Sequence, residues 1–207
     1  AEPGDTVTVL DISMVKNSDA LSQLLAKDVV VDYVDHHAAG AIPDHPNLTT
    51  TISEAPEACT ALLVNGRLRG ERVEWAITGA FGDNLDEPAQ RLAEKSGLQV
   101  SDIAGLKELG VCINYNGYGP SLDDLQFHPD ALYESLLEAG RPQAFLGSST
   151  FRQLQQGYQE DLAASAALTP IVEEPAFAVY QLPDAAWARR VSGVFSNDLV
   201  RAFPARA

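Results

Sequence analysis

The feature that most constrains the fold is an alternation of two β-branched runs and one amphipathic segment near the start of the chain. The first run covers residues 6–10, apolar side chains recur with helical spacing over 17–27, and a valine-rich run follows at 29–34. Strand, helix and strand in so short a stretch form a βαβ unit, whose two strands are parallel and joined by a right-handed crossover. We therefore predict an α/β fold with a parallel sheet whose first two strands lead into Asp11 and Asp35.

The rest of the chain is predicted to be mostly helical, with one further strand soon after the βαβ unit and another near the C-terminal end. A threonine-rich run at 48–53 predicts that strand. A second, short strand is expected at 177–182, followed by a helix that Asp184 caps and that runs towards residue 203. Helical periodicity predicts the intervening helices over 58–68, 71–81, 87–96, 100–114, 128–139 and 149–168.

A proline-bracketed acidic stretch suggests where the chain divides. Pro170 and Pro175 flank residues that look like a linker. One strand and one helix beyond it cannot bury a core by themselves. We expect one domain over 1–170, and a linker with the beginning of a second α/β domain over 171–207.

Composition narrows the classes of function. With 207 residues, 45% of them apolar, the chain can bury a sizeable core. Fourteen Lys and Arg against 29 Asp and Glu leave a net charge of −15, which argues against an extended grip on long nucleic acid and favours small substrates. Two cysteines cannot build a disulfide framework, and no run of 18 apolar residues occurs, so a reducing cytoplasmic setting without membrane association is expected.

Acidic and histidine side chains follow the predicted strands. Asp11 and Asp35 end two neighbouring parallel strands, the edge where open α/β sheets bind ligands, and His36 and His37 come next. Asp83 follows a helical segment rich in small residues that permit close backbone approach. Each residue also has an ordinary interpretation as a turn, cap or surface group, but one metal site accounts for all of them. Carboxylate and imidazole together suit Mn²⁺, Fe²⁺ or Zn²⁺.

Four segments, in this order, resemble motifs of the DHH phosphoesterase family. The strongest is Asp35-His36-His37 at a strand end, and the match covers most of the chain. The resemblance implies that residues 1–170 form a DHH-type catalytic domain and that 171–207 contain the beginning of its substrate-binding domain. The matching segments are 10–13, 35–37, 59–63 and 80–84.

The resemblance also implies a ligand set and a chemistry. In the family two Mn²⁺ ions activate water against a phosphodiester or phosphoanhydride. By position, Asp11 would bridge both ions, and His36 and Asp83 would complete the shell of the second. Asp35 and His37 would orient His36 and contact the substrate phosphate.

Two family features have no counterpart in these residues. Nothing before Asp11 matches the Asp-rich first motif, and no Gly-rich, His-containing loop follows residue 197. The chain thus resembles the middle part of a longer family member, with the missing segments on another chain or removed. We expect at most one tightly bound Mn²⁺.

Five residues in the C-terminal half are candidates for substrate binding. The loop that starts at Asn114 either faces substrate or simply terminates a helix. The arginines can bind phosphate through paired hydrogen bonds or serve as ordinary surface charges. The candidates are Asn114, Asn116, Arg189, Arg190 and Asn197.

Two functions of different classes follow from this pattern. The first is a Mn²⁺-dependent phosphoesterase that hydrolyses phosphodiester bonds of a small nucleotide or short oligonucleotide. The alternative is a non-catalytic module on the same scaffold that binds a metal or nucleotide, which the incomplete two-metal site favours.

Overall fold

The computed structural model describes residues 1–206, and by its internal contacts the chain forms two compact units. The first is Ala1–Gly110, and the second begins at Val111, within one long helix. No helix among the described residues is both long and apolar enough to cross a membrane.

The first unit contains a three-stranded parallel sheet. Its strands are β1 (Thr6–Leu10), β2 (Val30–Asp35) and β3 (Leu48–Ile52), in the order β1-β2-β3. Both pairings are parallel, so all three strands end at one edge of the sheet. This confirms the predicted α/β class and the predicted parallel pairing of the strands that lead to Asp11 and Asp35.

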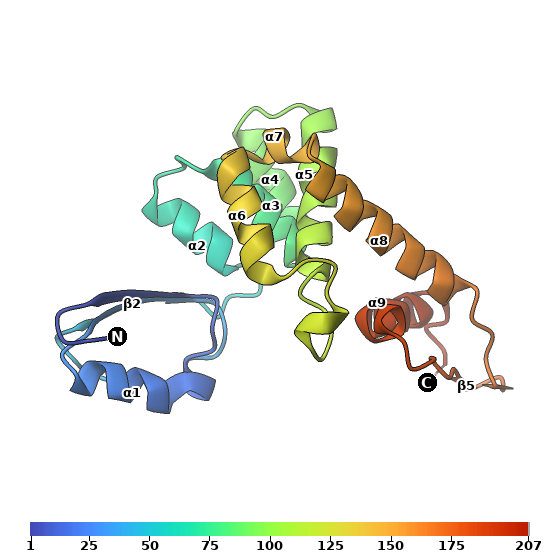
Figure 1. Cartoon of the computed structure of the whole chain (residues 1–207), viewed down its shortest axis with the longest axis horizontal. Coiled ribbons are helices and arrows are strands. Elements are labelled where there is room, and N and C mark those ends of the chain that lie inside the picture. The colour runs from blue at the N-terminus through green and yellow to red at the C-terminus, as the bar shows by residue number, and fades with distance from the viewer. Residues whose placement is uncertain (207) are drawn as a thin grey trace. The chain divides into compact units, whose positions relative to one another are not determined.

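One apolar core lies between the sheet and α1 (Ser18–Ala26), which covers one face of it (Figure 1). The alternation of side chains along β2 sends Val31 and Tyr33 towards that helix, where both are buried. A short 3₁₀ turn, η1 (Val15–Asn17), leads into α1. The core consists of Met14, Leu21, Leu25, Val29, Val31, Tyr33 and Ala39.

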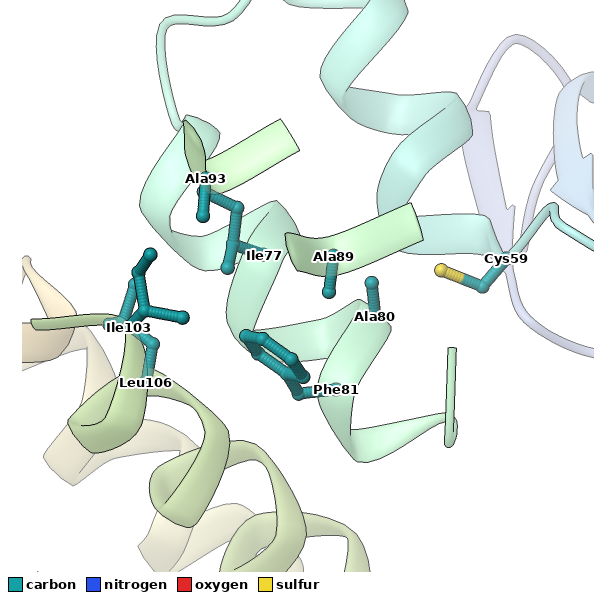
Figure 2. Close-up of a cluster of buried hydrophobic side chains, with 8 residues drawn as sticks. All are labelled: Cys59, Ile77, Ala80, Phe81, Ala89, Ala93, Ile103 and Leu106. Carbon is teal, nitrogen blue, oxygen red and sulfur yellow. The ribbon is translucent and has the colours of Figure 1, made fainter. Parts of the chain in front are cut away.

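A second core of the same unit is helical (Figure 2). Three of its eight buried residues are alanines, Ala80, Ala89 and Ala93, which have no exposed surface. Such side chains allow helix axes to approach closely, and this keeps the end of the third helix near the sheet edge. The helices are α2 (Thr60–Arg67), α3 (Val73–Gly82), α4 (Asp86–Lys95) and α5 (Val100–Tyr115), of which the part up to Gly110 belongs to this unit.

The second unit is helical with one small hairpin. Aromatic contacts such as Phe145 with Phe151 and Tyr180 with Phe195 fill its interior. Its elements after α5 are η2 (Leu122–Asp124), α6 (Pro129–Ala139), α7 (Pro142–Leu146), α8 (Ser149–Ala166), β4 (Val172–Glu173), β5 (Ala178–Val179) and α9 (Ala186–Ala202).

Two predictions for the C-terminal part are wrong. The strand expected over 177–182 is only the two-residue β5, which pairs antiparallel with β4 inside the predicted linker. Asp184 does not cap the last helix, because its carboxylate pairs with Arg189 and the N-cap residue is Ala185. Prolines on both sides of β5 limit its ladder. The domain division near residue 170 stays a prediction, distinct from the division into compact units.

Candidate metal centre

Asp11 stands at the strand-end edge because the chain turns sharply after β1. Its backbone adopts a φ of 61°, in the left-handed region that Asp tolerates better than most residues. Its N–H still donates to the carbonyl of Val34 at 3.1 Å, which keeps the residue in register with β2. The buried Tyr33 hydroxyl donates to the Ile12 carbonyl at 2.6 Å and holds the following residue. The carboxylate is thereby placed at the edge and left accessible.

His36 lies between two carboxylates. Its Nε2 is 3.4 Å from Oδ1 of Asp11 and 3.6 Å from Oδ2 of Asp83. Its Nδ1 is 3.1 Å from the carbonyl oxygen of Ala58, which can only accept, so Nδ1 carries the proton. In the neutral ring, Nε2 is then a lone pair that faces two acceptors. A cation between the three groups would compensate this arrangement.

Asp35, the last residue of β2, has no exposed surface and orients the second histidine. Its Oδ1 accepts from Nδ1 of His37 at 2.7 Å. This hydrogen bond raises the pKa of His37, against the opposing effect of burial. The other oxygen, Oδ2, is buried and has no hydrogen-bond partner among residues 1–206. The carboxylate therefore fixes the tautomer and direction of His37 while part of its charge stays uncompensated.

Asp83 reaches the centre from the end of α3, where it is the C-cap residue. Helices α2 and α3 approach so closely that a Cβ on Gly79 would lie 2.6 Å from Cβ of Ala61. This confirms the expectation that small residues in this segment serve close packing. Burial raises the pKa of Asp83, and the charge of Asp11 adds to the effect, whereas His36 and His37 oppose it. The centre thus carries an excess of negative charge.

These side chains suit a divalent cation. One ligand atom each from Asp11, His36 and His37 lie within 4.8 Å of one another, and Asp83 adjoins through His36. Mixed carboxylate and imidazole ligands fit Mn²⁺, as well as Fe²⁺ or Zn²⁺. The residues present fit one such ion. The ligand atoms that the structure brings together are those of Asp11, His36 and His37, and Asp83 is joined to them by its distance of 3.6 Å to His36. The set of Asp11, His36 and Asp83, with water in the remaining positions, stays the prediction.

One residue of the centre was not predicted from the sequence. Thr60, at the start of α2, donates its hydroxyl to Oδ1 of Asp11 at 2.7 Å, across 49 residues of sequence. A threonine at a helix start normally signals only a cap. No local pattern identifies so distant a partner.

The five predicted substrate-binding residues all lie in the second unit, where most have protein partners of their own. The Asn116 amide is buried and makes two hydrogen bonds with the Phe127 backbone, while Asn114 donates to the Tyr118 hydroxyl. The segment that contains them ends α5, which agrees with its interpretation as a helix-terminating turn. The other three are Arg189, which pairs with Asp124 and Asp184, Arg190, which pairs with Asp161, and Asn197, which is exposed on α9.

The arginines are therefore more constrained than free surface charges. Arg190 makes two hydrogen bonds to the buried Asp161 carboxylate and a third to the Asp124 carbonyl. A guanidinium so engaged has little capacity left for a phosphate. The role of these residues in substrate binding stays a prediction.

Comparisons of the chain with protein-family models, with curated proteins and with solved structures find no match.

Proposed function

We propose that this protein is a Mn²⁺-dependent phosphoesterase of the DHH family, which hydrolyses phosphodiester bonds of a small nucleotide or short oligonucleotide. The observation that carries the proposal is the position of His36, whose Nε2 lies 3.4 Å from a carboxylate oxygen of Asp11 and 3.6 Å from one of Asp83. A cation between these groups removes the repulsion. The order of the motifs along the chain supplies the family.

The chain's own residues have distinct parts in this proposal. Asp11, His36 and Asp83 hold the ion. Asp35 holds His37, whose exposed ring can donate a hydrogen bond from Nε2 to a substrate phosphate when it is protonated. When bound, Mn²⁺ supplies Lewis-acid activation of water and neutralises charge that develops on the phosphate.

The cellular setting is part of the same proposal. Cys59 and Cys112 are both buried and form no disulfide, as expected for core cysteines. Cysteines outside disulfides accord with a reducing compartment, so we place the enzyme in the cytoplasm.

A second candidate function is a non-catalytic module that binds one metal ion or a nucleotide. The observation that favours it is the size of the ligand set, since the described residues that cluster here suffice for one ion. Two-metal hydrolysis needs a second set.

Metal binding and hydrolysis separate the two functions. The protein is stripped with chelator and titrated with Mn²⁺ by calorimetry, and the loaded protein is assayed with a chromogenic phosphodiester. His36→Ala is compared with His128→Ala, which removes an exposed imidazole outside the centre. We expect binding and hydrolysis that only His36→Ala abolishes. Binding without hydrolysis would support the module, and absence of Mn²⁺ binding would contradict both the phosphoesterase and a metal-binding module.

A further inference from the structure

The segment that opens α2 contacts two of the expected metal ligands. The Ala58 carbonyl accepts from His36, and two residues later the Thr60 hydroxyl donates to Asp11. The two contacts involve Nδ1 of His36, on the other side of the ring from the expected ligand atom Nε2, and Oδ1 of Asp11. Each contact therefore fixes the direction in which an expected ligand points. A single short stretch of chain thus orients two ligands that belong to different strand ends.

We propose that Thr60 is a positioning residue for the metal centre, which orients the Asp11 carboxylate for the ion; the inference rests on the proposed Mn²⁺ site. Thr60 is almost completely buried, and its hydroxyl has the carboxylate as its partner at 2.7 Å. A carboxylate oxygen has two lone-pair sites, so Oδ1 keeps one free and Oδ2 keeps both. The hydrogen bond fixes the rotamer of Asp11 without blocking coordination.

Orientation matters at Asp11 because little else holds its side chain. The carboxylate is more than half exposed, and its backbone lies in a left-handed turn rather than in the strand. An exposed Asp samples several rotamers, and freezing one of them costs conformational entropy on metal binding. The Thr60 hydroxyl removes that cost before the ion arrives.

The helix that carries Thr60 is held independently of the Asp11 contact, at its far end and along one side. At the far end of the helix, Arg67 donates two hydrogen bonds to the carboxylate of Asp32 on β2, at 2.8 and 2.6 Å. Along its side, Ala61 packs against Gly79 of α3. A hydroxyl on so restrained a helix can specify a direction for its acceptor.

Three threonine variants test the proposal. Thr60→Val keeps the shape and removes the hydroxyl, whereas Thr60→Ser keeps the hydroxyl. Thr78→Val is the matched control, because Thr78 is equally buried in the same unit but donates to the Glu74 carbonyl of its own helix. The readouts are the Mn²⁺ dissociation constant from calorimetry and the visible absorption of the protein loaded with Co²⁺, which reports coordination geometry.

We expect Thr60→Val to weaken Mn²⁺ binding by about 10–100-fold and to alter the Co²⁺ spectrum, as for other groups that orient a ligand. Thr60→Ser should restore both readouts, and Thr78→Val should leave them as in the wild type. Wild-type affinity in Thr60→Val, or failure of Thr60→Ser to restore it, would overturn the role of Thr60 and leave the proposed function standing.

A metal-free measurement keeps the two proposals apart. In chelated protein, Thr60→Val and Asp11→Ala, each of which removes one partner of the hydrogen bond, are combined in a double-mutant cycle of unfolding midpoints. Non-additive midpoints are expected because the two side chains share one hydrogen bond. If the midpoints are non-additive but the protein binds no Mn²⁺, the hydrogen bond is only a structural contact. The absence of Mn²⁺ binding then refutes the proposed function and the inference that rests on it. Additive midpoints would overturn the inference alone.

Discussion

In the second compact unit the carboxylate of Asp161 is buried beside the guanidinium of Arg190, whereas in the first unit the carboxylate of Asp35 is buried beside only an imidazole, that of His37. Asp161 also accepts from the Tyr115 hydroxyl at 2.7 Å, and burial together with this bond raises the pKa of Tyr115. Each oxygen of Asp161 has a donor, whereas one oxygen of Asp35 has none in the described part of the chain.

The same contrast holds for the other acidic groups of the two units. Asp124 is matched by Arg189, which holds the pKa of that carboxyl below its usual range. Among residues 1–206, neither Asp11 nor Asp83 is paired with a Lys or Arg, and the pKa of Asp83 is raised by burial. In the second unit the guanidinium groups neutralise the buried carboxylates, whereas the first unit keeps the uncompensated negative charge on which the proposed cation site rests.

The largest expected effect is a loss of unfolding free energy when the positive charge beside Asp161 in the second unit is removed. Arg190→Ala leaves Asp161 buried without its counter-charge, which typically costs about 3–5 kcal/mol of unfolding free energy. Urea unfolding measures the loss. The control is Arg201→Ala on the same helix, an exposed residue whose removal should cost no more than about 0.5 kcal/mol. Equal costs for the two variants would contradict the structural role of the pair.

The next prediction concerns the histidines of the uncompensated cluster. His36→Ala should abolish Mn²⁺ binding, because it removes an expected ligand. His37→Ala should weaken binding by about 10–100-fold, the range of a group that acts from outside the coordination shell. Calorimetry gives both affinities and a stoichiometry expected to be one. Equal losses would contradict the assigned roles, and a stoichiometry of two would show a second ligand set.

Close helix packing in the first unit gives a test of how Asp83 is placed. Gly79→Ala puts a methyl group 2.6 Å from the Cβ of Ala61 and should destabilise the unit by about 1–3 kcal/mol, with weaker Mn²⁺ binding as α3 shifts. Gly66→Ala is the matched control, since its Cβ meets nothing within 4 Å.

A second substitution makes that test specific. Ala61→Gly, combined with Gly79→Ala, removes the opposing methyl group and should restore much of the metal affinity. If the double variant binds Mn²⁺ no better than Gly79→Ala, the packing of α2 on α3 does not position Asp83.

The smallest expected effects are changes in the unfolding midpoint, which should have opposite signs when Asp83 of the first unit and Asp124 of the second are each replaced by Asn. Asp83 has a raised pKa when folded, so its favourable contribution exists below the unfolded value of about 3.9 and is lost as the pH rises through the folded pKa. At neutral pH its charge therefore opposes folding. Asp83→Asn should raise the unfolding midpoint of chelated protein slightly, although it removes an expected metal ligand.

Asp124 has a lowered pKa, mainly through its hydrogen bonds with Arg189. Its contribution is present above about pH 3.9 and is lost as the pH falls through the folded pKa. Asp124→Asn should lower the midpoint at neutral pH, and its difference from the wild type should shrink on acidification. Midpoints of both variants between neutral and acid pH check the signs; like signs at neutral pH would break the comparison.

The sequence by itself determined the βαβ unit, the parallel sheet and most helices, because hydrophobic periodicity is a local signal. It also placed Asp11 and the Asp35-His36-His37 run at one edge, since parallel strands of one sheet end on the same side. The sequence did not predict the hairpin of the two-residue strands β4 and β5, because prolines lie close to these strands. It assigned the cap of α9 to Asp184, whose carboxylate instead pairs with Arg189.

Only the tertiary structure decided which partners each polar group has. Arg190 is a phosphate candidate in the sequence, yet its guanidinium faces Asp161, 29 residues away. Thr60 is an ordinary helix start in the sequence, yet its hydroxyl meets Asp11 from 49 residues away. Periodicity specifies which face of an element is buried, but the pairing of side chains across elements depends on distances of a few tenths of an ångström, which arise only when helices and sheet pack together.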